Sequence, residues 1–384
     1  MNLTTLQFRI KDETSGKHLQ KMGWAVNFVW NYCNEVNQDR WKKFLKTYSA
    51  FDLSNKTAGC SKELGLHSQT VQAICEEFAK SCKQAEKVRL GWRSRKRSLG
   101  WIPFKASGVK VNGDSITYQG RTFRFWLSRP IESKVRFGSF AQDSEGHWFV
   151  NLVVEDKTVE RTRTGKEVGV DLGLKTIATL SDGVELDREN LTKKYEDKLA
   201  IAQRAKKKGQ ITAIHFKIKN KRKDWNQKTT TRLVRTYDRI AVGNVSSSKL
   251  IKTRMAKSVS DAGWSSFKTM LAYKAIALGI EVKEVNERFS TVTCSGCKER
   301  TGPKGQANLG VRGWECSACG ASHRRDVNAA KNILNSFHLG YQMLSKESPA
   351  LGHRGTAGRM SISTSLLAAQ VHHFLVGQGV LLDR

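Results

Sequence analysis

Two Cys-x2-Cys pairs near the C-terminal end constrain what this chain can fold into more than any other feature. Cys294 and Cys297 form the first pair, Cys316 and Cys319 form the second, and 18 residues separate the pairs. Thiolates at this spacing can close one tetrahedral four-sulfur site around zinc, and a closed site leaves no open position, so the zinc would be structural. The pattern predicts one zinc ribbon over residues 290–322. The alternative is four free cysteines that match the spacing by chance.

The chain carries a large excess of positive charge. It contains 66 Lys and Arg against 35 Asp and Glu, which gives a formal net charge of +31. A compact chain with this charge repels itself unless a polyanion neutralises it, and nucleic acid is the obvious polyanion because binding releases its condensed counterions. The charge therefore predicts a nucleic-acid partner, without saying which kind.

Membrane and secreted proteins are disfavoured. The sequence contains no apolar run long enough for a membrane span, and its first residues lack the apolar segment of a secretory signal. Of the eight cysteines, four are scattered and four form the two pairs, which is typical of a reduced compartment with a metal site. We therefore expect no membrane partner and a cytoplasmic location.

The pattern of apolar residues divides the N-terminal part into a β unit and a helical insertion. Residues 2–10 alternate like a strand, and the following segment has the three- and four-residue spacing of helices. Short alternating runs separated by Gly, Asp and Ser turns occupy residues 107–155. We therefore predict a small β-barrel or sheet made of residues 1–15 and 91–160, with residues 16–90 inserted as helices.

From residue 167 onward, predicted strands alternate with helices, which favours an α/β layer architecture. We assign residues 161–289 and 323–340 to this α/β domain, with the zinc ribbon inserted before its last helix. Residues 341–384 are Ser/Gly-rich and weakly patterned, so we expect a mobile tail there, although its apolar end could dock as a helix.

Two carboxylates stand at the ends of predicted elements. Asp171 ends an apolar strand just before a glycine turn, where a buried strand rarely carries Asp without a partner or a metal. Asp326 opens a helix directly after the second cysteine pair. Each has an ordinary alternative, because Asp171 could be a satisfied turn residue and Asp326 a helix N-cap. Their joint occurrence with the zinc pattern favours the functional interpretation.

The motifs resemble those of the TnpB (OrfB) family, in the same order. GVDLGLKTIATL, a basic helical stretch, TCSGC with CSACG, and RRDVNAAKNIL resemble its RuvC-like nuclease half, and VWNYCNE resembles its VYN motif. Members are transposon-associated, RNA-guided DNA endonucleases related to the type V CRISPR effectors. The resemblance implies an α/β multi-domain fold: a wedge-type β-barrel with a helical recognition insertion, then an RNase H-like RuvC domain whose zinc ribbon contacts target nucleic acid.

The resemblance also implies a catalytic site with two Mg²⁺ ions held by carboxylates. Asp171 matches the family's first acid and Asp326 its last, but the middle glutamate is missing, because Gly243 stands there. Either the nuclease is inactive or another acid supplies the charge. We favour Glu287 on the neighbouring predicted strand, because adjacent strand ends lie about 5 Å apart and a glutamate spans that distance.

Two basic stretches are candidates for nucleic-acid contact. In WRSRKRSLGWIPFK, aromatic residues interleave with Arg and Lys, as base stacking and phosphate contacts require. The second stretch, within 193–208, is equally well explained as a solvated helix face. The predicted contact residues are Arg93, Arg95, Lys96, Arg97, Trp101, Lys206, Lys207 and Lys208.

Together these features predict an RNA-guided, Mg²⁺-dependent endonuclease associated with a transposable element. We expect it to cut double-stranded DNA beside a short flanking motif, as a monomer with one guide RNA derived from the transposon end. Two alternatives stay open. Gly243 is the argument for a nuclease-inactive, RNA-guided DNA-binding regulator, and a guide-free DNA transposase is the other.

Overall fold

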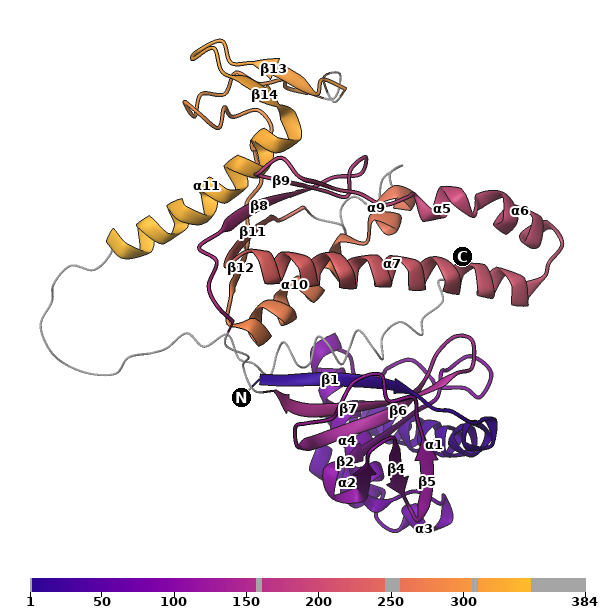
Figure 1. Ribbon diagram of the computed structural model, residues 1–384. Coiled ribbons are helices and arrows are strands. Elements are labelled where there is room, and N and C mark those ends of the chain that lie inside the picture. Colours follow the sequence, from indigo (N-terminus) through magenta and orange to yellow (C-terminus); the bar gives the residue numbers. More distant parts are fainter. Residues whose placement is uncertain (1, 157–160, 246–255, 306–307, 309, 347–384) are drawn as a thin grey trace, which may run out of the picture. The chain divides into compact units, whose positions relative to one another are not determined.

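The computed structural model describes residues 2–156, 161–245, 256–305, 308 and 310–346 (Figure 1). These fall into two compact units. The first unit holds the described residues up to 156, and the second holds those from 161 to 346.

The first unit contains a four-stranded antiparallel sheet in the order β1-β7-β6-β2. Its strands are β1 (Asn2–Arg9), β7 (Trp148–Asp156), β6 (Val135–Gln142) and β2 (Trp101–Lys105). A second sheet follows the short 3-10 helix η1 (Ala106–Gly108) and contains β3 (Val109–Asn112), β4 (Ser115–Tyr118) and β5 (Arg121–Arg124). A bridge between Ile10 and Phe125 links the two sheets. The described ladders do not form one continuous barrel, because β3, β4 and β5 pair with one another.

The helical insertion shares its core with this sheet. Its described helices are α1 (Glu13–Phe44), α2 (Ala50–Lys56), α3 (Cys60–Glu63) and α4 (Ser68–Ala85). Helix α1 begins after Asp12, whose carboxylate accepts a hydrogen bond from the Ser15 N–H. Val26 of α1 and Ile74 of α4 pack in the same apolar cluster as Phe8 of β1. The insertion is therefore part of one compact unit with the sheet.

The second unit contains a five-stranded sheet in the order β10-β9-β8-β11-β12. Its strands are β8 (Glu167–Leu172), β9 (Ala178–Leu180), β10 (Glu185–Leu186), β11 (Arg239–Gly243) and β12 (Glu281–Val285). Strands β8 to β10 are antiparallel neighbours, whereas β11 runs parallel to β8 and β12, so these three strands end at the same edge. Gly243 lies opposite Val285, which confirms that the two strand ends are neighbours.

Helices cover both faces of this sheet (Figure 1). The described helices are α5 (Leu191–Lys194), α6 (Glu196–Arg204), α7 (Lys208–Thr236), α9 (Ala256–Ala262), α10 (Trp264–Leu278) and α11 (Arg325–Lys346). Leu233 of α7 and Phe267 of α10 pack against Val170 on one face. On the other face, Ile333 of α11 packs against Ala241.

Helix α11 continues past the boundary that we expected. It runs through residue 346, because residues 341–346 contain neither glycine nor proline to end a helix. The rest of the expected tail, residues 347–384, lies outside the described residues. The short strands β13 (Gly313–Glu315) and β14 (Ser322–Arg324) precede α11 and pair antiparallel.

Gly169 lets α11 lie unusually close to β8. A Cβ atom built there would overlap the carbonyl oxygen of Ala330 and lie 2.9 Å from the Leu334 nitrogen. These backbone atoms move only if the helix moves, so Gly169→Ala should destabilise the unit by about 1–3 kcal/mol through overpacking. Urea unfolding measures this. Gly209→Ala, which meets nothing within 4 Å, is the control, and equal midpoints for the two variants would show that the helix yields easily.

Candidate active site and zinc centre

Three carboxylates come from elements that meet at one edge of the five-stranded sheet in the second unit. Asp171 lies near the end of β8, Glu287 follows the end of β12, and Asp326 lies in the first turn of α11. Because side chains alternate along a strand and Val170 faces the α7–α10 core, Asp171 faces α11, as Gly169 does. The fold therefore directs Asp171 towards the helix that carries Asp326.

The charges of the three carboxylates interact. Burial, together with the negative charges of Glu287 and Asp326, raises the pKa of Asp171 to about 7, while Arg325 opposes this shift. Burial also raises the pKa of Glu287, and the Lys268 ammonium opposes that shift. The effect on Asp171 requires that the charges of Glu287 and Asp326 lie near its carboxylate, so this edge gathers negative charge.

Glu287 fills the space above Gly243. A Cβ atom built on Gly243 would overlap the Oε2 atom of Glu287, and it would lie 3.3 Å from Glu287 Cβ and from Ile333 Cδ1. The Glu287 N–H donates to Asn244 Oδ1 at 3.3 Å, and the Asn244 N–H donates to the Val285 carbonyl at 2.9 Å. The carboxylate of Glu287 thus lies where a side chain at position 243 would begin.

Asp326 is not an N-cap. Helix α11 begins at Arg325, so Asp326 lies inside the first turn, where the positive end of the helix dipole favours a carboxylate. Its oxygens accept hydrogen bonds from Arg312 Nη1 at 3.0 and 3.3 Å. Sequence reasoning missed Arg312, because an arginine in a polar loop gives no local sign of the carboxylate that it will meet.

The three carboxylates do not form a compact ligand group of the kind that the cysteines form. Among the described residues, the cysteines are the group whose ligand atoms all lie within 4.8 Å of one another. Carboxylate oxygens are nevertheless ligands that Mg²⁺ prefers, so the chemical type of these side chains is compatible with magnesium.

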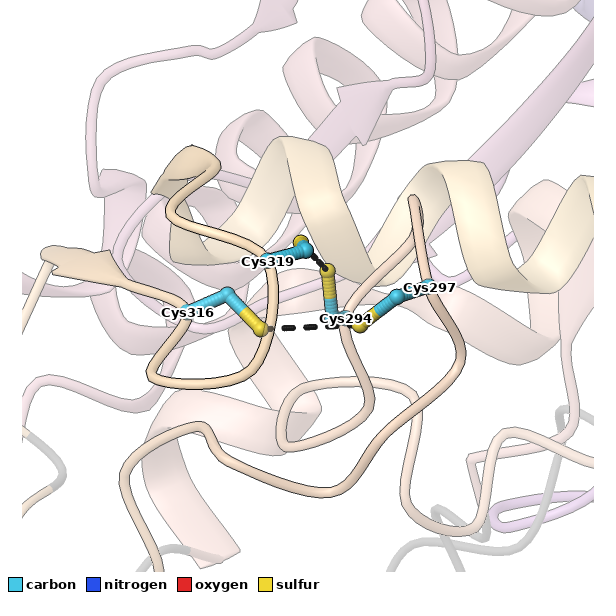
Figure 2. Close-up of side chains that lie close together, drawn as sticks. All are labelled: Cys294, Cys297, Cys316 and Cys319. Atoms are coloured by element: carbon cyan, nitrogen blue, oxygen red, sulfur yellow. Dashed lines mark hydrogen bonds between the residues drawn. The ribbon is translucent and has the colours of Figure 1, made fainter.

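The four predicted zinc ligands do come together (Figure 2). Their sulfur atoms lie within 4.8 Å of one another, with Cys294–Cys319 at 3.7 Å and Cys297–Cys316 at 3.6 Å. Zn–S bonds of about 2.3 Å in a tetrahedron place the sulfurs about 3.8 Å apart. The four-cysteine cluster is therefore compatible with one zinc ion.

Two side chains that contact the cysteine sulfurs could not be identified from the sequence alone. The Thr301 hydroxyl donates to Cys316 Sγ at 3.1 Å and lowers the pKa of that thiol. His323 Nε2 lies 3.0 Å from Cys294 Sγ, and its ring packs against Trp314 with the centroids 4.6 Å apart. Such donors orient metal-binding thiolates and reduce their charge.

Two predicted nucleic-acid contacts are corrected. Trp101 is 4% exposed in β2, so its ring is not available for base stacking. The Arg93 side chain donates to Asn27 Oδ1 at 2.7 Å and to the Leu99 carbonyl at 3.0 Å, and its guanidinium lies over Trp30 and Trp101. Burial lowers the pKa of Arg93 to about 10. The interleaved Arg and Trp residues include a buried cation–π contact.

The other predicted contact residues are exposed. Arg95 lies over the Trp24 ring at 4.9 Å, next to exposed Lys96 and Arg97. The remaining three, Lys206, Lys207 and Lys208, are exposed at the turn into α7. The role of these six residues in nucleic-acid binding stays a prediction.

No helix in the described ranges combines the length and apolarity that crossing a bilayer would take.

Replacing Arg95, Lys96 and Arg97 with Ala should weaken nucleic-acid binding and lower its salt dependence. Each lost phosphate contact should reduce the slope of log affinity against log salt by roughly 0.7–0.9. Arg93→Ala should instead destabilise the first unit by about 1–3 kcal/mol, because the buried Asn27 side chain and the Leu99 carbonyl lose their donor. Fluorescence anisotropy in a salt series and thermal unfolding separate the two outcomes. An unchanged slope in the triple variant would show that its side chains merely face solvent.

Two family models match the chain. Residues 151–254 match a model described as "Probable transposase", and residues 264–333 match a model described as "Cas12f1-like, TNB domain". The second match covers the cysteine pairs and Asp326.

Several curated proteins are similar in sequence. A protein of Streptomyces pristinaespiralis named "Putative RNA-guided DNA endonuclease" is 31% identical over 286 residues, covering 70% of this chain and 68% of the relative. The InsQ protein of Escherichia coli K12, with the same description in its name, is 27% identical over 309 residues, covering 71% and 75%. The "TnpB-like protein L79" of Acanthamoeba polyphaga mimivirus is 30% identical over 164 residues, covering 41% and 30%.

A solved structure shares the fold. It is titled "Cryo-EM structure of the Cas12f1-sgRNA-target DNA complex", with a TM-score of 0.56 and 13% sequence identity, and the match covers 85% of this chain and 83% of that one. At 13% sequence identity, this similarity shows a shared fold and no more.

Proposed function

This chain belongs to the TnpB (OrfB) family, and on that premise we propose that it is an RNA-guided endonuclease that cuts double-stranded DNA beside a short flanking motif. The names of its relatives support guided DNA cleavage, and the Cas12f1 structure of the same fold contains a guide RNA and a target DNA. The net charge of +31 is consistent with two nucleic-acid partners. We further propose a monomer with one RNA from the transposon end.

The convergence of Asp171, Glu287 and Asp326 carries the proposal for the chemistry. In the bound state, two Mg²⁺ ions would activate water and stabilise the leaving oxygen of a phosphodiester. Asp171 supplies an enclosed carboxylate from the rigid centre of the sheet, and Glu287 supplies one from the neighbouring strand end. Asp326 adds a third from α11, whose tight contact with β8 fixes its distance from Asp171.

Arg312 gives Asp326 a counter-ion in the absence of a metal. Their ion pair is partly exposed, so it contributes little to stability. Asp326 could therefore exchange this partner at small cost, and the Arg312 guanidinium would then be available to pair with a substrate phosphate.

A nuclease-inactive, RNA-guided DNA-binding regulator is the second candidate. The glycine at position 243 favours it, because the family's middle glutamate is absent there. The position of Glu287 supports the endonuclease instead, since its carboxylate fills the space above this glycine. The two candidates differ in one observable, which is whether the guided complex cuts.

The experiment begins with the RNA that co-purifies with the full chain. Sequencing this RNA gives its variable end, and duplexes that match it, with randomised flanks, are incubated with the complex in Mg²⁺ or in EDTA. Cleavage in Mg²⁺ alone supports the endonuclease, whereas binding without cleavage supports the regulator. A chain that carries no RNA of discrete length, yet joins or cuts DNA, would be a guide-free transposase.

A further inference from the structure

Phe289 has a backbone conformation that is unusual for its residue type. Its φ angle is 67°, in the left-handed region that favours glycine, and a large aromatic residue is strained there. The side chain is 40% exposed, so burial does not offset that strain. Glycine would fit this turn without strain. A binding role for the exposed ring would account for a phenylalanine at this strained position.

The turn that carries Phe289 is held firmly beside the candidate active site. It follows Glu287 directly, and the Ser290 N–H donates to the Glu287 carbonyl at 3.0 Å. Two buried asparagines of α11 fix it from the other side. Asn328 Nδ2 donates to the Thr293 carbonyl at 2.8 Å, and Asn332 Nδ2 donates to the Ser290 carbonyl at 2.9 Å. The ring is thus fixed relative to the helix that carries the last acid.

Two guanidinium groups lie against the Phe289 ring. Arg288 is 4.7 Å from the ring centroid and Arg300 is 4.1 Å from it, and both side chains are exposed. In the part of the chain that the structure describes, neither is paired with a carboxylate, whereas Arg312 pairs with Asp326 and Arg324 pairs with Glu185. Arg288 and Arg300 therefore keep their charge and hydrogen-bond donors available for an external anion.

We propose that Arg288, Phe289 and Arg300 form a clamp for the sugar–phosphate backbone of a single DNA strand entering the carboxylate site. The inference rests on the proposed function, because it takes the neighbouring Glu287 to act on DNA. The ring orders two flexible guanidiniums, and the guanidiniums bind phosphate oxygens. We favour a single strand over a duplex, because in a single strand both the phosphates and the bases are accessible. One aromatic ring with two cations can then contact the phosphates and an adjacent base of the same strand.

The test measures binding of single-stranded oligothymidylate to the guide-bound full chain, in an Asp171→Asn background that prevents cutting. Arg300→Ala should weaken binding by at least about three-fold and reduce the salt slope by roughly 0.7. Arg136→Ala is the matched control, because it removes an exposed arginine that already pairs with Glu155 in the first unit. It should leave affinity and slope unchanged.

Phe289→Gly separates a binding role from a structural one. It removes the ring but keeps both charges and suits the left-handed backbone, so Tm should hold or rise while oligothymidylate affinity falls several-fold. Phe289→Tyr should retain affinity. A lower Tm in Phe289→Gly with unchanged affinity, or an unchanged slope in Arg300→Ala, would overturn the clamp. If the wild-type complex never cuts while these variants still lose strand binding, the proposed nuclease fails and the clamp stands.

Discussion

Glu287→Gln should abolish cleavage of a guide-matched duplex, slowing it by at least about a thousand-fold, as loss of one member of a catalytic unit does. The substitution keeps size and hydrogen bonding but removes the charge that holds a divalent cation. Asp171→Ala and Asp326→Ala should be equally inactive. Binding of guide and target should survive in all three, because phosphate contacts and base pairing do not use these carboxylates.

Glu284→Gln is the matched control for this variant. Glu284 lies in β12, three residues before Glu287, and its exposed carboxylate accepts a hydrogen bond from Lys268 at 2.6 Å. The substitution removes the same charge at a short distance from the site, so a general electrostatic effect would appear in both variants. Single-turnover cleavage rates should fall only in Glu287→Gln. Equal rates for the two variants would exclude Glu287 from the chemistry.

Cys297→Ser should remove zinc and unfold the C-terminal part of the second unit. A structural zinc site contributes of order 10 kcal/mol to folding, and three thiolates cannot hold the ion as tightly as four. Cys60→Ser, in α3 of the first unit, is the control for the same change at a cysteine outside the cluster. Metal analysis should find one zinc per chain in the wild type and the control, and much less in Cys297→Ser.

The same variant should also lower cleavage without touching a carboxylate. Asn328 connects the first cysteine knuckle to α11, because its Oδ1 accepts from the Ser295 N–H at 2.8 Å. Loss of the zinc therefore loosens the segment between Glu287 and Asp326. Wild-type protein without zinc, or a Cys297→Ser protein with unchanged melting and zinc content, would contradict the four-thiolate site.

Some parts of the candidate site depend only on short stretches of sequence, and these parts could be predicted. Asp171 ends a buried strand, Asp326 opens a helix, and the cysteine spacing itself describes a tetrahedral site. The prediction of Glu287 assumed that its strand lies beside the strand that ends at Gly243. The pairing of Gly243 with Val285 confirms that these two strands are neighbours. The space that Glu287 fills above that glycine could be seen only in three dimensions.

Other features depend on tertiary contacts that leave no local pattern. Arg93 and Trp101 stand in a sequence that suggests a nucleic-acid surface, but the same alternation of cations and rings occurs when a guanidinium is buried between tryptophans. Arg312 and His323 were missed because their partners come together only when the ribbon folds against α11. The strained ring of Phe289 is a backbone property, and sequence does not report a φ angle.

Moving the acid back to position 243 tests the relocation of the family's glutamate most directly. Gly243→Glu alone should impair cleavage, because its Cβ overlaps the Glu287 carboxylate. Glu287→Ala clears that space but removes the charge, so it should be inactive. With both changes, the nearest atoms to the new Cβ are those at 3.3 Å, and a glutamate fits after a small adjustment. Gly243→Glu should therefore lower the cleavage rate when position 287 is glutamate and raise it when position 287 is alanine.

The deciding measurement is the single-turnover cleavage rate of the Gly243→Glu/Glu287→Ala chain against that of Glu287→Ala, with equal guide and target binding. If Glu287 has replaced the family's glutamate, the double variant should cut at least about ten-fold faster than Glu287→Ala, because it restores one carboxylate to the same space. A Glu287→Ala chain that cuts as fast as the wild type, or a double variant no faster than Glu287→Ala, would contradict this account of the active site.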